Sequence, residues 1–329
     1  MKTTQTVLFF LTLLLFTNCK GPVQKQDYVL KGGVFGTSYR INYLNGSKNY
    51  QKSLDSLFLE INNSVSTYIP NSVISKINSG EKGIVIDEIF TEVFKKSKII
   101  YKETGGFFDP TVGNLVNAYG FGPKKEKKNL TNEEIKTYMQ FVGLNKVILQ
   151  GDEIRKEHPK VYLDFNSIAK GFAIDIVARF FDAKNIENYI IEIGGEIRAK
   201  GTKKNNKPWV IKLVNPVKAY DSDGFKVINL SDKAMATSGN YRKFRITDDG
   251  KKYVHTINPK TGLATESNLL SASVIASLDC ADVDAYATAF MAMGLEKTKA
   301  FLKNRSDLKV ILIYTANDGA LAEFSTYSF

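Results

Sequence analysis

Apolar residues recur at helical spacing in several segments of the chain. Leu54, Phe58 and Ile61 lie three or four positions apart, as on one face of an amphipathic helix. Thr131 and Glu134 form a capping-box pattern, which is typical of a helix start. These patterns predict helices over residues 50–65, 87–103, 131–141, 168–181, 282–293 and 295–304.

The second half of the chain is dominated by short runs rich in β-branched and aromatic residues. Asp249-Gly250 has the sequence of a hairpin turn, and Asn317-Asp318-Gly319 predicts a second hairpin near the C-terminus. Strands are expected over residues 33–43, 188–199, 208–214, 225–230, 241–247, 253–257, 269–277, 308–315 and 320–328. Helices prevail in the first half and antiparallel-type strands in the second, with no repeat and no Pro- or Ser-rich linker. The predicted class is therefore α+β, packed as one unit.

An apolar run near the N-terminus does not fit this pattern. Lys2 precedes the stretch 7–16, which has the length of a signal-peptide core and is too short to span a bilayer. The run is followed by Cys19, as in a bacterial lipobox, where the thiol is acylated. Asn18 departs from the small residue usual there, and a plain secretory signal is the alternative. We expect a signal peptide over 1–18, a tether over 19–32 and one domain over 33–329.

The composition of the 329 residues is that of a globular protein, with 43% hydrophobic and 12% aromatic residues. The net charge of +11 would attract nucleic acid, anionic lipid or an anionic small molecule. The lysines are scattered apart from short runs at 124–125 and 127–128, so nucleic-acid binding is not favoured. Besides Cys19 only Cys280 remains, which excludes an internal disulfide in a lipidated chain. Cys280 is expected to be a small buried residue rather than a nucleophile.

Two segments of the central region could hold a nucleotide. In residues 105–113 two glycines let the backbone approach a flat ligand, and Phe107 and Phe108 offer stacking faces. A helix end followed by a buried turn is the alternative. Residues 164–171 open a helix whose free N–H groups favour an anion, and Lys170 adds a positive charge suited to a diphosphate. Here the alternative is an ordinary N-cap with a solvated lysine.

The last third of the chain contains candidate metal ligands and a candidate base. Asp284 and Thr288 are four residues apart, so they share one helix face, and their oxygens suit Mg²⁺. Acids near a helix start, such as Asp282, also simply complement the helix dipole. His255 precedes a Pro/Gly turn, and an imidazole that titrates near about 6.5 can accept a proton there, although a structural histidine is the alternative. His158 lies in a polar turn and is expected to be exposed. No Walker A motif, dinucleotide glycine fingerprint or zinc spacing is present.

Taken in order, the motifs of the chain resemble those of the ApbE family, the FAD:protein FMN transferases. The resemblance extends from about residue 33 to 295. It is carried by segments 35–37, 66–70, 107–113, 119–123, 164–171, 192–196, 236–239, 255–262 and 281–288. The family implies a T-fold-like antiparallel sheet with packed helices.

The resemblance also implies roles for individual residues. Flavin or adenine would be held by Tyr68 and by Phe107, Phe108 and Asp109, and Asp164 would bind the nucleotide. Lys170 would bind the diphosphate, while the main-chain oxygen of Ser167 and the side chains of Asp284 and Thr288 would hold Mg²⁺. His255 and Ile257 would line the site beside the flavin. The chain departs from the family at Phe35, where methionine is common, and at Lys260, where arginine is common; Phe35 would still cover a flavin ring.

The implied reaction is the Mg²⁺-dependent transfer of FMN from FAD to a Thr or Ser hydroxyl of an acceptor flavoprotein, with release of AMP. His255 is the candidate base, and Asp284 acts through the metal. The implied acceptors are flavoprotein subunits of membrane or periplasmic redox complexes, and the expected location is the bacterial cell envelope, lipid-anchored and facing the periplasm or exterior. An Mg²⁺-dependent FAD diphosphatase and a non-catalytic flavin-binding lipoprotein are the alternatives.

Overall fold

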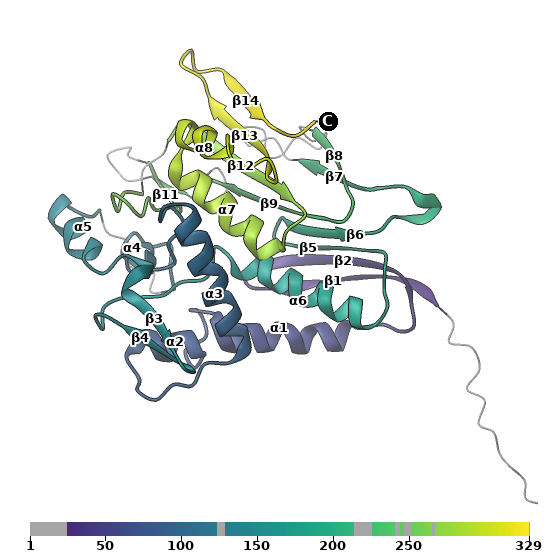
Figure 1. The fold of residues 1–329 in the computed structure, drawn as a ribbon, viewed down its shortest axis with the longest axis horizontal. Coiled ribbons are helices and arrows are strands. Elements are labelled where there is room, and N and C mark those ends of the chain that lie inside the picture. The colour runs from purple at the N-terminus through teal and green to yellow at the C-terminus, as the bar shows by residue number, and fades with distance from the viewer. Residues whose placement is uncertain are drawn as a thin grey trace, which may run out of the picture.

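The computed structural model describes residues 25–123, 129–213, 226–240, 244–246, 252–264 and 267–328. Its central element is an antiparallel sheet of eight strands in the order β1-β2-β5-β6-β9-β12-β13-β14 (Figure 1). The strands are β1 (Gln26–Val34), β2 (Thr37–Gly46), β5 (Tyr189–Ile193), β6 (Glu196–Lys200), β9 (Lys233–Gly239), β12 (Leu269–Ala276), β13 (Lys309–Thr315) and β14 (Leu321–Ser325).

Four long helices cover one face of this sheet and form the main hydrophobic core with it (Figure 1). They are α1 (Gln51–Val65), α3 (Glu88–Glu103), α6 (Ala169–Ala183) and α7 (Cys280–Met293). The apolar face of α1 is buried as its spacing predicts, through Leu54, Phe58 and Ile61. The side chain of Asp87 caps α3 by accepting a hydrogen bond of 2.7 Å from the N–H of Phe90.

The opposite face of the sheet packs against a separate hairpin of β7 (Trp209–Leu213) and β8 (Lys226–Leu230). The alternation of side chains along β9 shows how one strand serves both layers. Ala234 and Ala236 belong to the core under the helices, whereas Met235 belongs to the smaller core under the hairpin.

Short elements gather beyond the end of the sheet (Figure 1). A third cluster of buried residues, which includes Leu115, Tyr119 and Ile257, packs among them. The elements are α2 (Val73–Ser79), α4 (Gly113–Ala118), α5 (Asn132–Met139), the 3₁₀ turn η1 (Leu144–Lys146), β3 (Val147–Gln150), β4 (Glu153–Lys156), β10 (Phe244–Ile246) and β11 (Lys252–Val254). Helix α8 (Leu295–Leu302) packs beside α7, and a 3₁₀ turn, η2 (Lys204–Asn206), precedes β7.

The predicted class is confirmed, and two predicted strands are each interrupted by a tight turn. The strand expected over 33–43 is broken where Phe35 and Gly36 adopt φ values of 50° and 73°. The strand expected over 188–199 is broken at Gly194 and Gly195, with φ values of 66° and 107°. Both turns join hairpins of the main sheet. Glycine adopts such left-handed values at little cost, and three of these four residues are glycines.

Other differences follow from weak local signals. The tether expected over 19–32 ends earlier, because β1 begins at Gln26 and pairs with β2. The strand β9, the short helices α2 and α4 and the hairpin of β3 and β4 were not predicted. Cys19 and the Asp249-Gly250 turn lie outside the described residues. Within the described ranges, no helix combines the length and apolar character that crossing a bilayer requires.

Candidate active site

A cavity of about 820 Å³ opens where the turns of the sheet meet the short elements. Its walls come from the β1–β2 turn, the end of α1, the loop after α3, the start of α6, the end of β9 and α7. Every ligand residue predicted for the domain lines this one cavity: Phe35, Tyr68, Phe107, Phe108, Asp109, Asp164, Ser167, Lys170, His255, Ile257, Asp284 and Thr288. Segments as far apart in the sequence as Phe35 and Thr288 thus meet at one cavity.

A cluster of three charged groups forms the polar end of the cavity. The ammonium of Lys170, on α6, lies 3.0 Å from Oε1 of Glu196 and 3.6 Å from Oδ2 of Asp284. The same Asp284 oxygen accepts a hydrogen bond of 3.2 Å from the N–H of Gly171. Glu196 and Asp284 are only 4% and 2% exposed, so the cluster is shielded from water.

Burial and pairing shift the protonation equilibria of this cluster. Burial raises the pKa of Glu196 to about 7, against the opposing effect of Lys170. Burial also raises the pKa of Asp284, again opposed by the lysine. For Lys170, burial disfavours the ammonium, but the two carboxylates outweigh it and raise its pKa, so the lysine stays charged.

Hydroxyl groups lie next to this charged cluster. Asp284 and Thr288 share one face of α7, as their spacing predicts, and both line the cavity. The Thr288 hydroxyl lies 3.2 Å from that of Ser238 at the end of β9. Ser167 lines the same cavity in the turn that leads into α6. Carboxylate and hydroxyl oxygens from three different segments therefore line the same cavity.

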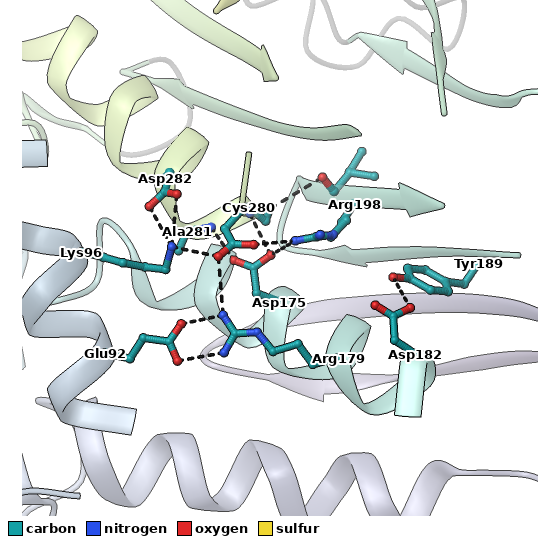
Figure 2. A network of polar contacts seen from close by, with 12 residues as sticks. Glu92, Lys96, Asp175, Arg179, Asp182, Tyr189, Arg198, Cys280, Ala281 and Asp282 are labelled. Atoms are coloured by element: carbon teal, nitrogen blue, oxygen red, sulfur yellow. Dashed lines mark hydrogen bonds and ion pairs between the residues drawn. The ribbon is translucent and has the colours of Figure 1, made fainter. Parts of the chain in front are cut away.

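The position of α7 is fixed from below by an ionic network (Figure 2). The buried carboxylate of Asp175, on α6, accepts hydrogen bonds of 2.8 and 2.9 Å from the N–H groups of Cys280 and Ala281, the first residues of α7. It also pairs at 2.5 Å with Arg198, which lies 3.0 Å from Asp279. A neighbouring helix thus caps α7, and it does so one turn before Asp284.

The two helices approach each other closely at the same point. A Cβ atom added to Gly171 would lie 2.4 Å from the carbonyl oxygen of Cys280, so only glycine fits there. This close approach brings the start of α6, with Lys170, beside the first turn of α7, with Asp284. Cys280 is buried and forms no disulfide with any described residue, as expected for a structural cysteine.

Asp282, expected to complement the helix dipole, lies in the first turn of α7 and also belongs to the outer part of this network. Its carboxylate lies 3.1 Å from the ammonium of Lys96 on α3, which also pairs at 2.9 Å with Asp279. These contacts join α3 to the start of α7 (Figure 2).

Aromatic and apolar side chains also line the cavity. Tyr68 is 51% exposed at its rim, and its hydroxyl lies 3.4 Å from the carbonyl oxygen of Phe121. Phe107 is partly exposed, with the ammonium of Lys297 5.0 Å from its ring centre. Phe35 sits in the tight turn and packs edge-on against Phe58. A half-exposed aromatic surface of this kind suits a planar ring system.

Two predicted contacts need correction or refinement. Phe108 is 1% exposed and belongs to the main core, so it offers no free stacking face, and only Phe107 does. The carboxylate of Asp109 accepts hydrogen bonds from the backbone and hydroxyl of Thr111 and from the N–H of Leu144. Asp109 therefore braces the loop that shapes the cavity wall.

The remaining predicted residues line the same cavity. His255 directly follows β11 and is half-buried, and Ile257 is buried in the third hydrophobic cluster. Asp164 is buried, and one of its carboxylate oxygens accepts a hydrogen bond of 2.9 Å from the N–H of Asn166. His158 is exposed as expected and stacks on Phe141.

Sequence reasoning missed Glu196, Thr237 and Ser238 as lining residues. All three belong to motifs that carried the family resemblance, the segments 192–196 and 236–239. Their signal was therefore present, but Glu196 begins β6 and Thr237 and Ser238 lie near the end of β9, and the bounds of these two strands were not predicted.

Comparison with known proteins identifies the family of the chain. The model of the ApbE family matches residues 35–312. The chain belongs to the ApbE family. It is 34% identical over 328 residues to the FAD:protein FMN transferase of Vibrio cholerae, covering 97% of this chain and 96% of that protein. The corresponding protein of Haemophilus influenzae is 33% identical, with 92% and 91% covered.

Solved structures of the family share the fold. The flavin transferase ApbE from Vibrio cholerae matches with a TM-score of 0.81 at 33% identity, covering 93% of this chain and 98% of that one. The apo form of the Pseudomonas stutzeri flavinyl transferase ApbE matches with a TM-score of 0.82 at 26% identity, covering 92% and 95%. The predicted fold of antiparallel sheet and packed helices is confirmed.

Proposed function

We propose that the chain transfers FMN from FAD to a Thr or Ser hydroxyl of an acceptor protein and releases AMP. The observation that carries this proposal is that one cavity is lined both by partly exposed aromatic side chains and by a buried cluster of charged groups. Its volume of about 820 Å³ is within the range of small-molecule sites, which extends to roughly 1,000 Å³. Relatives that cover nearly the whole chain are named for this reaction.

The residues of the chain would divide the chemical work. Tyr68 and Phe107 would hold the flat rings, and Lys170 with the start of α6 would hold the diphosphate. The acceptor hydroxyl attacks the phosphorus on the FMN side, the bond between the two phosphates breaks, and AMP leaves. A ring nitrogen of His255 would take the hydroxyl proton during the attack.

The oxygens around Asp284 fit a divalent cation. The described residues contain no group of three or more His, Cys, Asp or Glu side chains placed to hold a metal, and the proposed ligand set draws on hydroxyl and main-chain oxygens as well. Such a mixed set of hard ligands suits Mg²⁺. Asp284 and Thr288 would hold it with the main-chain oxygen of Ser167. When bound, Mg²⁺ neutralises negative charge on the phosphate oxygens.

A close alternative is hydrolysis, with water in place of the acceptor hydroxyl. One incubation of the protein with FAD, Mg²⁺ and a candidate acceptor domain separates the possibilities. Flavin fluorescence on the denatured acceptor band supports transfer, free FMN without labelled acceptor supports the diphosphatase, and unchanged FAD supports a pure binder. Only the first result agrees with the proposal.

We also propose that the protein acts at the cell envelope. Acylation of Cys19 would anchor it on a membrane, facing the periplasm or exterior. The acceptors would then be flavoprotein subunits of membrane or periplasmic redox complexes. The apolar run before Cys19 supports this location.

A further inference from the structure

When both carboxyl groups are ionised, the charged cluster carries two negative charges and one positive charge. One ammonium, that of Lys170, is shared between Glu196 at 3.0 Å and Asp284 at 3.6 Å. The second oxygen of Glu196, Oε2, is buried and has no hydrogen-bond partner. The cluster therefore has one carboxylate acceptor more than the lysine needs.

The position of the lysine conflicts with the binding of a cation. Because Lys170 lies next to Asp284, a divalent cation on that carboxylate would meet a like charge in a site shielded from water. Asp284 is held in place by the N–H of Gly171, and it lies on a capped helix. Lys170 has a flexible four-carbon stem and is 28% exposed, so the lysine is the group free to move.

Glu196 offers the place to which the lysine can move. It is the first residue of β6, directly after the tight turn at Gly194 and Gly195, and is paired with β5. Its Oε1 lies 3.0 Å from the ammonium, closer than the Asp284 oxygen at 3.6 Å. Its Oε2 accepts no hydrogen bond and can receive one from the lysine.

We propose that Lys170 is an internal counter-cation of Asp284 in the metal-free protein, and that Glu196 is the positioning residue that draws the lysine away when a divalent cation binds. This inference rests on the metal site of the proposed function. It gives a role to Glu196, the third charged residue of the cluster. In the proposed function Lys170 binds the diphosphate and Asp284 binds the cation, and neither step uses Glu196. The lysine remains in the cavity, where it can contact a diphosphate.

The inference is tested by titrating Mn²⁺ into the FAD-free protein and measuring binding by calorimetry. Glu196→Gln keeps the volume but removes the charge, so Lys170 should pair with Asp284 alone and compete with Mn²⁺. We expect the apparent affinity to fall by about tenfold, the scale of a close charge coupling. Lys170→Met in the Glu196→Gln background should restore affinity to the wild-type level or above, as a double-mutant cycle reveals.

The outcomes separate this inference from the proposed function. Unchanged affinity in Glu196→Gln overturns the inference, and so does a loss that Lys170→Met fails to restore, which would make Glu196 itself a cation ligand. Asp284→Asn serves as the control for the site. If wild type and Asp284→Asn bind Mn²⁺ equally, the metal site of the proposed function fails, and the inference fails with it.

A second variant guards against misfolding. Lys170→Met alone should bind Mn²⁺ several-fold more tightly than wild type, because the competing ammonium is gone. Equal or weaker binding by this variant overturns the inference, whatever the fate of Glu196→Gln. The thermal unfolding midpoint of each variant, measured without metal, shows whether it is folded.

Discussion

Asp175 is a buried carboxylate with two different sets of partners, and substitution can tell which set matters. It accepts hydrogen bonds from the N–H groups of Cys280 and Ala281, and it forms an ion pair with Arg198 (Figure 2). We predict that Asp175 stabilises the fold mainly as the cap of α7. Arg198 also pairs with Asp279, so loss of the Asp175 charge does not leave the guanidinium alone.

The magnitude follows from the contacts that each variant loses. Asp175→Ala leaves two buried N–H groups without an acceptor, each worth about 1–3 kcal/mol, so the free energy of unfolding should fall by about 2–6 kcal/mol. Asp175→Asn keeps one acceptor oxygen, and the cost should be about half or less. Loss of the negative charge itself should change the free energy of unfolding little, because burial disfavours the charged form and raises the pKa of Asp175 to about 6 from its ordinary value near 4.

The raised pKa also fixes the sign of a pH dependence. The folded chain takes up a proton on Asp175 more readily than the unfolded chain does. The resulting stability is fully present below about pH 4 and is lost as the pH rises through about 6. The wild type should therefore gain about 2–3 kcal/mol relative to Asp175→Asn between pH 7 and pH 4.

Urea unfolding followed by circular dichroism measures these differences. Glu92→Gln is the matched control, because its pair with Arg179 in the same network is exposed and should be worth less than about 1 kcal/mol. If Asp175→Asn is as destabilising as Asp175→Ala at pH 7, the pair with Arg198 dominates and the capping argument is refuted.

Four further predictions concern the site and the leader. Asp284→Ala should lose nearly all FAD cleavage and bind Mg²⁺ more weakly; full activity with Mg²⁺ as the only metal would exclude it as a ligand. His255→Ala should lower single-turnover transfer by about 10²–10⁴-fold with little change in FAD affinity, and parallel loss of both would indicate a structural histidine. Gly171→Ala should force α6 and α7 apart at the Cys280 carbonyl, costing about 1–3 kcal/mol in urea unfolding, and an unchanged midpoint would contradict the close approach. Cys19→Ser should release the protein from membranes, whereas a wild type without lipid by mass spectrometry contradicts the anchor.

The helices were predictable because their signals are local. Leu54, Phe58 and Ile61 show the spacing of α1, and Thr131 with Glu134 forms the capping box that the structure contains. The splitting of the strand expected over 188–199 was not predictable from alternation alone. It depends on left-handed conformations at Gly194 and Gly195, and a Gly-Gly pair fits many backbone conformations.

The site was predictable through its motifs rather than through its contacts. Spacing alone placed Asp284 and Thr288 on one helix face, but it could not bring Lys170 or Glu196 to them, because those residues lie on other elements. The role of Asp175 could not be predicted either. Nothing in the sequence around an aspartate inside one helix indicates that it caps another helix. Contacts between distant segments are set by packing, which the pattern along the chain does not encode.

The cavity draws its lining from Phe35 near the start of the domain to Thr288 close to its end. During synthesis the nascent chain therefore has no complete flavin site until α7 has left the ribosome. A fragment that ends before Cys280 would contain Lys170 and Glu196 but no Asp284 beside them. The complete site for the proposed FAD substrate would therefore form only in chains that include α7, and a chain that crossed a membrane unfolded would carry no flavin with it.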